Sequence, residues 1–394
     1  MEIRTLGKAL IAFSIAATAV LGQPAPSMAQ DVPGQIDDGD CDDLLLSPPD
    51  DGEGGVTGII SGANTALTCD QNLRNHLTVV YLSDTIRQIV GGRLNSNSLC
   101  ASVDEEDLSD EERRRREESC TTQNGLIITQ TGAPVQKRFN AWIDSKTTWI
   151  EAGNKDVSPT DGPAVNASGG IDYRINDRVI LGLLGSFEHS NLDTGGFIPS
   201  TTKTEGFGGG AYLGVTVTPN IVFSGMVTGT AIKTDLDYDF VAASLDSTRL
   251  QASGSFTGYW YFQTMRLSPS VTLAWSKEWQ DAFTDNLGFP GPAQRYESAV
   301  LTIGNQIGRT FALTSGDTIE PWGGAQFDWT FLSNVDIDGF GETKYQDSYD
   351  LRVQAGFNYV FAGGGQLAVT GEIGGLAMPD NSTYSGAVNY SLQF

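Results

Sequence analysis

The stretch "MRLSPSVTLAWSKEW" (residues 265–279) alternates between two kinds of side chain. Its apolar positions are Leu267, Val271, Leu273 and Trp275. Most of the positions between them are polar, namely Ser268, Ser270, Thr272, Ser276 and Glu278. Successive side chains of a β-strand point to opposite faces. The stretch therefore predicts a strand with one apolar face and one polar face.

The same period of two recurs from residue 139 to the C-terminus, for example in "TIEPWGGAQFDWTF" (318–331) and "DLRVQAGFNYVF" (350–361). Glycine is abundant, at 47 residues, and only 18% of the residues are charged, which also favours β-structure. The pattern predicts twelve strands, at 139–151, 164–175, 178–190, 203–217, 220–235, 246–262, 265–280, 294–311, 317–332, 347–361, 365–376 and 383–394.

The connections between these strands alternate in length. Short turns follow the even-numbered strands, namely "ND" (176–177), "TPN" (218–220), "QT" (263–264), "TSGD" (314–317) and "AGGG" (362–365). Most of the other connections are longer and polar, such as "SNVDIDGFGETKYQD" (333–347). This alternation is typical of transmembrane β-barrels, which have short periplasmic turns and longer outer loops. A soluble β-sandwich need not alternate its loop lengths and usually has shorter strands, so it is disfavoured. A soluble lipocalin-like barrel is disfavoured because it has about eight strands and an apolar interior.

The chain ends on another alternating stretch, "YSGAVNYSLQF" (384–394). Its apolar positions, which we expect to face lipid, are Tyr384, Val388, Tyr390, Leu392 and Phe394. The last strand of a closed barrel must pair with the first, because closure removes the sheet edges. The terminal aromatic residue also resembles the signal read by the bacterial outer-membrane assembly machinery. We therefore predict that Tyr390, Leu392 and Phe394 form the barrel-assembly signal.

The N-terminal residues differ from the rest of the chain. Residues 1–29 are predicted to be a secretory signal peptide, with Arg4 and Lys8 before an apolar core and "SMA" before the cleavage site. Four cysteines follow, at Cys41, Cys69, Cys100 and Cys120. An even number in an exported chain suggests two disulfides. Four cysteines can pair in three ways, of which we prefer Cys41 with Cys69 and Cys100 with Cys120. A metal site is disfavoured because CxxC and clustered histidines are missing from the sequence.

Residues 30–137 form a second predicted region, which is acidic and partly helical. Residues 31–55 are too rich in Asp, Gly and Pro to fold alone. Apolar spacing predicts an amphipathic helix over 68–90, which we expect Gly91 and Gly92 to end. A second helix is predicted around 104–119. The net charge of −24 argues against nucleic acid as a partner, because its phosphates would be repelled.

Residues 138–394 resemble the C-terminal translocator barrel of autotransporters (type V secretion). The resemblance depends on an ordered set of segments, which are "RFNAW" (138–142), "GIDYRINDRVILGLLGSFEHSNLD" (170–193), "GGGAYLGVTVTPN" (208–220), "STRLQASGSFTGYWYF" (247–262), "MRLSPSVTLAWSKEWQDAFTD" (265–285), "IEPWGGAQFDWTF" (319–331) and "VNYSLQF" (388–394). It implies an all-β fold, a twelve-stranded antiparallel transmembrane β-barrel, here preceded by a small helical, disulfide-containing region. It also implies a bacterial outer-membrane protein that carries an N-terminal passenger to the cell surface.

The chain departs from the family pattern before the barrel. The passenger region is short and lacks solenoid repeats, so it cannot be a β-helical passenger. The family places a helix in the pore just before the first strand, whereas 121–137 is a poor helix former.

An alternative is a porin-like channel that the N-terminal region plugs. In that interpretation Arg113, Arg114, Arg115 and Arg116 meet inward carboxylates, for which the candidates are Glu188, Glu320, Asp328 and Glu372. The competing interpretation of the four arginines is a solvated run of charge.

A barrel hydrolase is a further alternative, because "EHSNLD" (188–193) places His189 beside Ser190. Adjacent residues of a strand point to opposite faces, so these two side chains cannot easily meet.

His76, on the predicted helix, is expected to be ordinary surface. The stretch holding Asp336 and Asp338 is too short for a calcium loop. We therefore expect no enzymatic activity and no cofactors. We also expect a monomer whose partners are outer-membrane lipid, the assembly machinery and its own N-terminal region.

Overall fold

The computed structural model describes one long helix and a β-barrel. The residues that it describes are 56–95, 137–152, 159–195, 199–238, 241–262, 265–339, 341–345, 347–362, 364–378 and 381–394. All of them belong to one compact unit, Ile36–Phe394. The predicted signal peptide and the predicted helix at 104–119 lie outside the described residues, and the predicted domain boundaries stay predictions.

Twelve antiparallel strands close the barrel. They are β1 (Phe139–Ala152), β2 (Thr160–Asn176), β3 (Val179–Thr194), β4 (Ser200–Thr218), β5 (Ile221–Tyr238), β6 (Val241–Gly258), β8 (Met265–Gln280), β11 (Gln294–Arg309), β13 (Thr318–Ile337), β15 (Ser348–Val360), β16 (Gly365–Gly374) and β17 (Ser382–Gln393). Each pairs with its neighbours in the chain, and β17 pairs with β1 from Asn140↔Gln393 to Glu151↔Ser382. The predicted barrel, and the predicted pairing of its last strand with its first, are confirmed.

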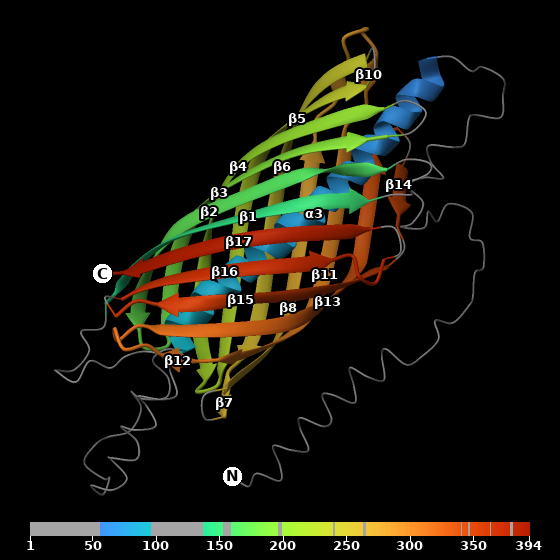
Figure 1. Ribbon diagram of the computed structural model, residues 1–394. Coiled ribbons are helices and arrows are strands. Elements are labelled where there is room, and N and C mark those ends of the chain that lie inside the picture. Colours follow the sequence, from blue (N-terminus) through green and yellow to red (C-terminus); the bar gives the residue numbers. More distant parts are fainter. Residues whose placement is uncertain are drawn as a thin grey trace, which may run out of the picture. The chain divides into compact units, whose positions relative to one another are not determined.

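Short strands add to this wall at its ends. They are β7 (Trp260–Phe262), β9 (Phe283–Thr284), β10 (Pro290–Gly291), β12 (Phe311–Ala312) and β14 (Gly341–Lys344). The strands β9 and β10 form a hairpin within the connection from β8 to β11, and β14 pairs with the end of β13. These additions lie at the end with longer loops, whereas β7 and β12 lie at the end with short turns (Figure 1).

The barrel has a polar inner face and an apolar outer face, as the alternation predicts. On β8, Val271 and Leu273 are 40% and 50% exposed, whereas Thr272 and Ser276 between and after them are buried. The outward residues of the last strand, among them Tyr390, are also exposed. This arrangement is the inverse of a soluble protein and is typical of a barrel whose outer face meets lipid. Among the described residues, no helix is both long and apolar enough to cross a membrane.

The helix α3 (Val56–Asn95) runs through the barrel from the long-loop end to the short-turn end (Figure 1). The predicted helix is therefore present, but the prediction that Gly91 and Gly92 end it was wrong. A Cβ added to Gly91 would lie 1.8 Å from Tyr259 Oη, so the phenol of the wall occupies the space that a side chain would need. Tertiary packing thus outweighs the low helix propensity of glycine here.

His76 is the other residue of α3 for which the sequence-based expectation was wrong. It is half-buried within the barrel, in the electrostatic environment of Asp328 and Arg352, and is not ordinary surface. A helix periodicity cannot show that the wall of a barrel surrounds this part of the helix, because that enclosure depends on residues far away in the chain.

Candidate functional site

The candidate functional site is the lumen of the barrel together with the helix that fills it. Toward the long-loop end, polar side chains of α3 bond directly to the wall. Gln71 Nε2 donates to Gln280 Oε1 at 2.7 Å, and Arg74 pairs with Glu278 at 3.1 Å. Both wall residues lie on β8 and are buried. A buried charge is stable only with a partner, so these contacts fix the helix against this strand.

Arg249 of β6 ties the same part of the helix to a second strand. Its guanidinium is fully buried, donates to Asn75 Oδ1 at 2.6 Å and pairs with Glu188 of β3. Glu278 lies 3.6 Å from the same guanidinium. The helix, β3, β6 and β8 therefore share one buried network of charges.

Halfway along the lumen, the helix bonds to strands on several sides. Tyr81 Oη lies 2.9 Å from Ser168 Oγ of β2, and Thr85 Oγ1 donates to Asp144 Oδ1 of β1 at 3.2 Å. On another side, Arg87 Nη1 donates to Ser270 Oγ of β8 at 3.1 Å. The strands that these bonds reach lie in different directions from the helix, so the bonds fix it to β1, β2 and β8 at once.

At the short-turn end, Arg93 holds the end of the helix where the first strand begins. Its Nε donates to Asp172 Oδ1 at 3.0 Å, and its Nη2 donates to the backbone oxygen of Arg138 at 3.3 Å. Asp172 also accepts from Asn140 Nδ2 at 2.8 Å and from Tyr212 Oη at 3.0 Å. The carboxylate therefore joins α3 to β1, β2 and β4.

An apolar cluster seals one side of the helix. The helix contributes Tyr81, Leu82, Ile86, Ile89, Val90 and Leu94 to it, and the wall contributes Trp142, Ile180, Leu184, Tyr212, Val222, Met226 and Tyr259. The fit is close, since a Cβ added to Gly214 would lie 2.4 Å from Val90 Cγ1. Burial of this kind stabilises the helix by excluding water from its surface.

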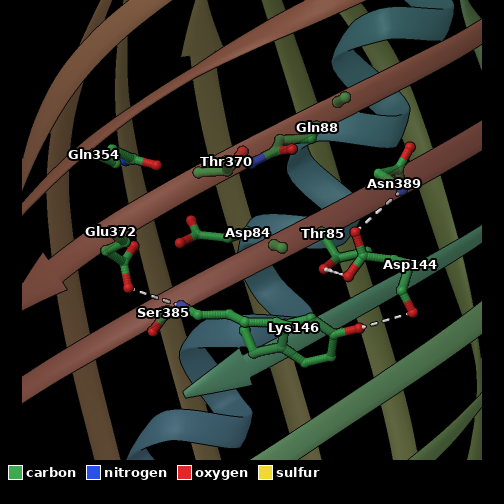
Figure 2. A pocket seen from close by; sticks show the side chains of 13 residues that line it. Asp84, Thr85, Gln88, Asp144, Lys146, Gln354, Thr370, Glu372, Ser385 and Asn389 are labelled. Carbon is green, nitrogen blue, oxygen red and sulfur yellow. Dashed lines mark hydrogen bonds and ion pairs between the residues drawn. The ribbon is translucent and has the colours of Figure 1, made fainter. Parts of the chain in front are cut away.

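The opposite side of the helix borders a polar cavity of about 40 Å³, shown in Figure 2. Its charged lining residues are Asp84 of α3, Asp144 and Lys146 of β1, and Glu372 of β16. Lys146 Nζ donates to Glu372 Oε1 at 2.7 Å. The remaining lining residues are Tyr81, Thr85, Gln88, Gln354, Ala368, Thr370, Ser385, Ala387 and Asn389.

The four carboxylates predicted as plug contacts all lie on the inner face of the barrel, next to cationic groups of the wall. Glu188 pairs with Arg249, and Glu320 pairs with Arg266 at 2.7 Å. In the same way, Asp328 pairs with Arg352, and Glu372 pairs with Lys146 and with Arg352. Arg113, Arg114, Arg115 and Arg116 lie outside the described residues, so their predicted contacts stay predictions.

Sequence reasoning did not identify the wall cations as the partners of these carboxylates. Arg249 and Arg352 share parity with polar neighbours along their strands, which places them on the polar face but does not show which carboxylates they meet. It also missed the residues of α3 that bond to the wall, because a partner on a distant strand leaves no local pattern in the helix.

The predicted assembly signal lies on the outer face of the closing strand. Tyr390, Leu392 and Phe394 are 41%, 42% and 59% exposed. The Phe394 ring stacks on Phe139 with 6.0 Å between centroids, and its backbone N donates to the Phe139 oxygen at 3.0 Å. The last residue thus meets the first residue of β1, while its role as a signal stays a prediction.

The predicted disulfides lie beyond what the structure describes. Cys41, Cys100 and Cys120 fall outside the described residues, and of Cys69 only its position in α3 is described. The pairing of these cysteines therefore stays a prediction.

His189 and Ser190, the candidate hydrolase pair, point to different faces of β3. Ser190 is buried, whereas the half-exposed side chain of His189 lies on the outer face, 3.7 Å from Glu205. The described residues include no group of three His, Cys, Asp or Glu side chains placed to hold a metal ion.

Comparisons with known proteins agree with this geometry. A family model, the autotransporter beta-domain, matches residues 141–373. The translocator domain of the autotransporter NalP from Neisseria meningitidis is 14% identical, with a TM-score of 0.53 over 72% of this chain and 95% of that one. The transport unit of AIDA-I from Escherichia coli is 11% identical, with a TM-score of 0.53 over 68% and 95%.

A third solved structure is similar to the same degree. The beta domain of the Bordetella autotransporter BrkA is 14% identical, with a TM-score of 0.52 over 65% of this chain and 100% of that one. No match was found among the curated proteins.

Proposed function

Because the chain belongs to the autotransporter family by its β-domain, we propose that its barrel lies in outer-membrane lipid and displays the residues before α3 at the cell surface. The observation that carries this proposal is the position of α3, which passes through a closed barrel from one end to the other. A chain threaded in this way has its two flanks on opposite sides of the membrane.

The direction of the helix decides which flank is outside. Gln71 meets Gln280 at the last residue of β8, just before the long connection to β11, whereas Arg93 meets the backbone of Arg138 beside the start of β1. Outer-membrane barrels place short turns in the periplasm and longer loops outside. Residues 30–55, which precede the helix, would therefore be the displayed segment.

Residues 96–136 would lie on the periplasmic side by the same reasoning. Both of their flanks are at the short-turn end, since Arg93 contacts Arg138 and Lys137 Nζ donates to the Gln393 oxygen at 3.1 Å. In this proposal α3 is the plug of the lumen. The four consecutive arginines then lie at the periplasmic end and do not plug the pore.

Three further expectations belong to this proposal. Residues 1–29 would be removed on export, Phe394 and its neighbours would be read by the assembly machinery, and the cysteines would pair in the oxidising periplasm. We propose no enzymatic activity, because the outer-face His189 cannot act as a base for the inner-face Ser190.

The proposal is tested with two tagged variants of the full chain, one tag within 31–55 and one within 96–136. Protease added to intact cells should remove the first tag and spare the second, and permeabilised cells should lose both. Protection of the first tag on intact cells would contradict display. Loss of both tags on intact cells would contradict the periplasmic position of 96–136.

A further inference from the structure

The helix is sealed more tightly on one side than on the other. Between Thr78 and Leu94 every residue of α3 is buried except Asp84, Gln88 and Gly92. These three residues are spaced by four, so they lie on one face of the helix. At 1.5 Å per residue, the stripe they form is about 12 Å long.

The wall opposite this stripe belongs to the last strands of the barrel. Asp84 lies 3.4 Å from Arg352 of β15, and Gln88 lines the cavity beside β1, β16 and β17. A Cβ added to Gly92 would find Gln366 Oε1 of β16 at 3.4 Å, which is ordinary contact distance. Gly92 is exposed at the short-turn end, so the gap reaches that mouth of the barrel.

The cavity at the centre of this gap is built to hold water. Gln354 is 4% exposed and lines the cavity, and its Nε2 has no hydrogen-bond partner within the described chain. A buried donor without a partner loses free energy unless water or another acceptor reaches it. About 40 Å³ of polar space is enough for water to enter.

The charges around the cavity favour cations. Asp84, Asp144 and Glu372 contribute three carboxylates to its lining, and Lys146 contributes one ammonium. Outside the cavity, Arg87 also bonds to Asp84, at 2.9 Å. Arg352 bonds to Asp84 and Glu372, and also to Asp328. With Arg87, Arg352 and Asp328 counted, four carboxylates face three cationic side chains, so one negative charge is in excess and attracts cations.

We propose that this gap between α3 and strands β1, β15, β16 and β17 is a hydrated path for small monovalent cations, which leaves the plugged barrel with a low, cation-preferring conductance. The inference rests on the barrel and its helix and does not require display of the N-terminal segment. A negative result in the tag experiment would therefore leave it standing.

The test is the reversal potential of the purified full-length chain in planar bilayers under a KCl gradient. Gln88 is the position to change, because it lies on the stripe and carries no charge. Gln88→Glu should raise the ratio of K⁺ to Cl⁻ permeability about twofold, and Gln88→Lys should lower it about twofold, for a unit charge ~10 Å from the ion in an aqueous path. Ser244→Lys, on the outer face of β6, is the matched control and should leave the ratio unchanged.

A second position guards against a helix variant that fails to fold. Gln366→Lys changes charge at the short-turn mouth from the strand side, and heat-modifiable migration on gels reports whether each variant forms a barrel. Lowering of the ratio by Gln366→Lys would support the path. The proposal is overturned by a wild-type current no larger than the lipid leak, or by a ratio that no Gln88 or Gln366 variant moves. Large conductance steps insensitive to these variants would also overturn it, because they would mean that the helix leaves the lumen.

Discussion

The two sides of the lumen are built from opposite kinds of contact. Toward β3–β6 and β8, α3 meets an apolar cluster and a buried charge network in which Arg249 has carboxylates on two strands. Toward β15–β17 and β1, it meets a polar cavity, and its stripe of Asp84, Gln88 and Gly92 is not fully buried. One side therefore fixes the helix, whereas the other leaves room for water. Retention of a plug and passage of small ions can thus coexist in one barrel.

The largest expected effect comes from the charge network on the sealed side. Arg249→Met would leave Glu188 buried without its cationic partner. Breaking a buried pair in this way costs about 3–5 kcal/mol. Urea titration of the protein in lipid vesicles, followed by tryptophan fluorescence, measures the loss. Arg178→Met, at an exposed turn residue, is the control, and an equal loss in both variants would contradict the proposed role of the network.

The apolar cluster on the same side should give a somewhat smaller effect. Ile86 is 2% exposed within it, so Ile86→Ala removes buried methyl groups and leaves a cavity. A loss of about 2–4 kcal/mol in the free energy of unfolding is expected. The same titration measures it. Val227→Ala, on the outer face of β5, is the control, because it leaves the lumen intact. This control variant should not change the protection of α3 from added protease.

Gly91 tests the close packing of the sealed side, because its missing side chain is what lets Tyr259 approach the helix. Gly91→Ala would place a Cβ 1.8 Å from the hydroxyl and 3.0 Å from Cζ of Tyr259. The clash should cost about 1–3 kcal/mol. Adding Tyr259→Phe removes the nearest atom and should recover part of that loss, which a double-mutant cycle measures. Simple additivity of the two changes would show that the two residues do not interact.

On the cavity side, removal of a charge should matter less. Lys146→Met takes one partner from Glu372, which keeps Arg352 at 3.0 Å and lines the cavity. We expect a loss of about 1 kcal/mol, well below that of Arg249→Met, because Glu372 keeps a second cationic partner and is not left buried without one. Urea titration of both variants in the same vesicles provides the measurement. If Lys146→Met destabilised the barrel as much as Arg249→Met, the two sides of the lumen would be equally sealed. That result would contradict the difference between them.

The smallest effect is expected at a turn outside both sides. Hydrogen bonds from Tyr359 Oη, the Ala362 backbone and Ser315 Oγ lower the pKa of Asp317 from 3.8. A carboxyl whose pKa is lower in the folded state than in the unfolded state stabilises the fold at pH values above its unfolded-state pKa. This stabilisation is lost as the pH falls through the folded-state pKa. Asp317→Asn should therefore be less stable than wild type near neutral pH, with the gap closing below about pH 4. A gap that widened on acidification would contradict this.

The barrel could be predicted closely from the sequence, whereas the lumen could not. Strand β8 was predicted at 265–280, the range that the structure shows, because the period of two and the turn residues are local signals. The end of α3 was missed at Gly91, since only Tyr259, far along the chain, explains why the helix continues. Pairs such as Arg249 with Glu188 were missed for the same reason, because two strands of correct parity do not reveal which inward residues meet.

The exposure of the two ends of the threaded segment tests most directly whether α3 passes through the barrel. Single cysteines at Thr57 and at Lys137, each in a background with the four native cysteines changed to serine, are treated on intact cells with a maleimide that does not cross the outer membrane. A helix that passes through the barrel with its N-terminal end outside predicts labelling of Thr57→Cys on intact cells, and labelling of Lys137→Cys only after permeabilisation. Labelling of Lys137→Cys on intact cells, or of neither position before permeabilisation, would contradict a helix that passes through the barrel with its N-terminal end outside.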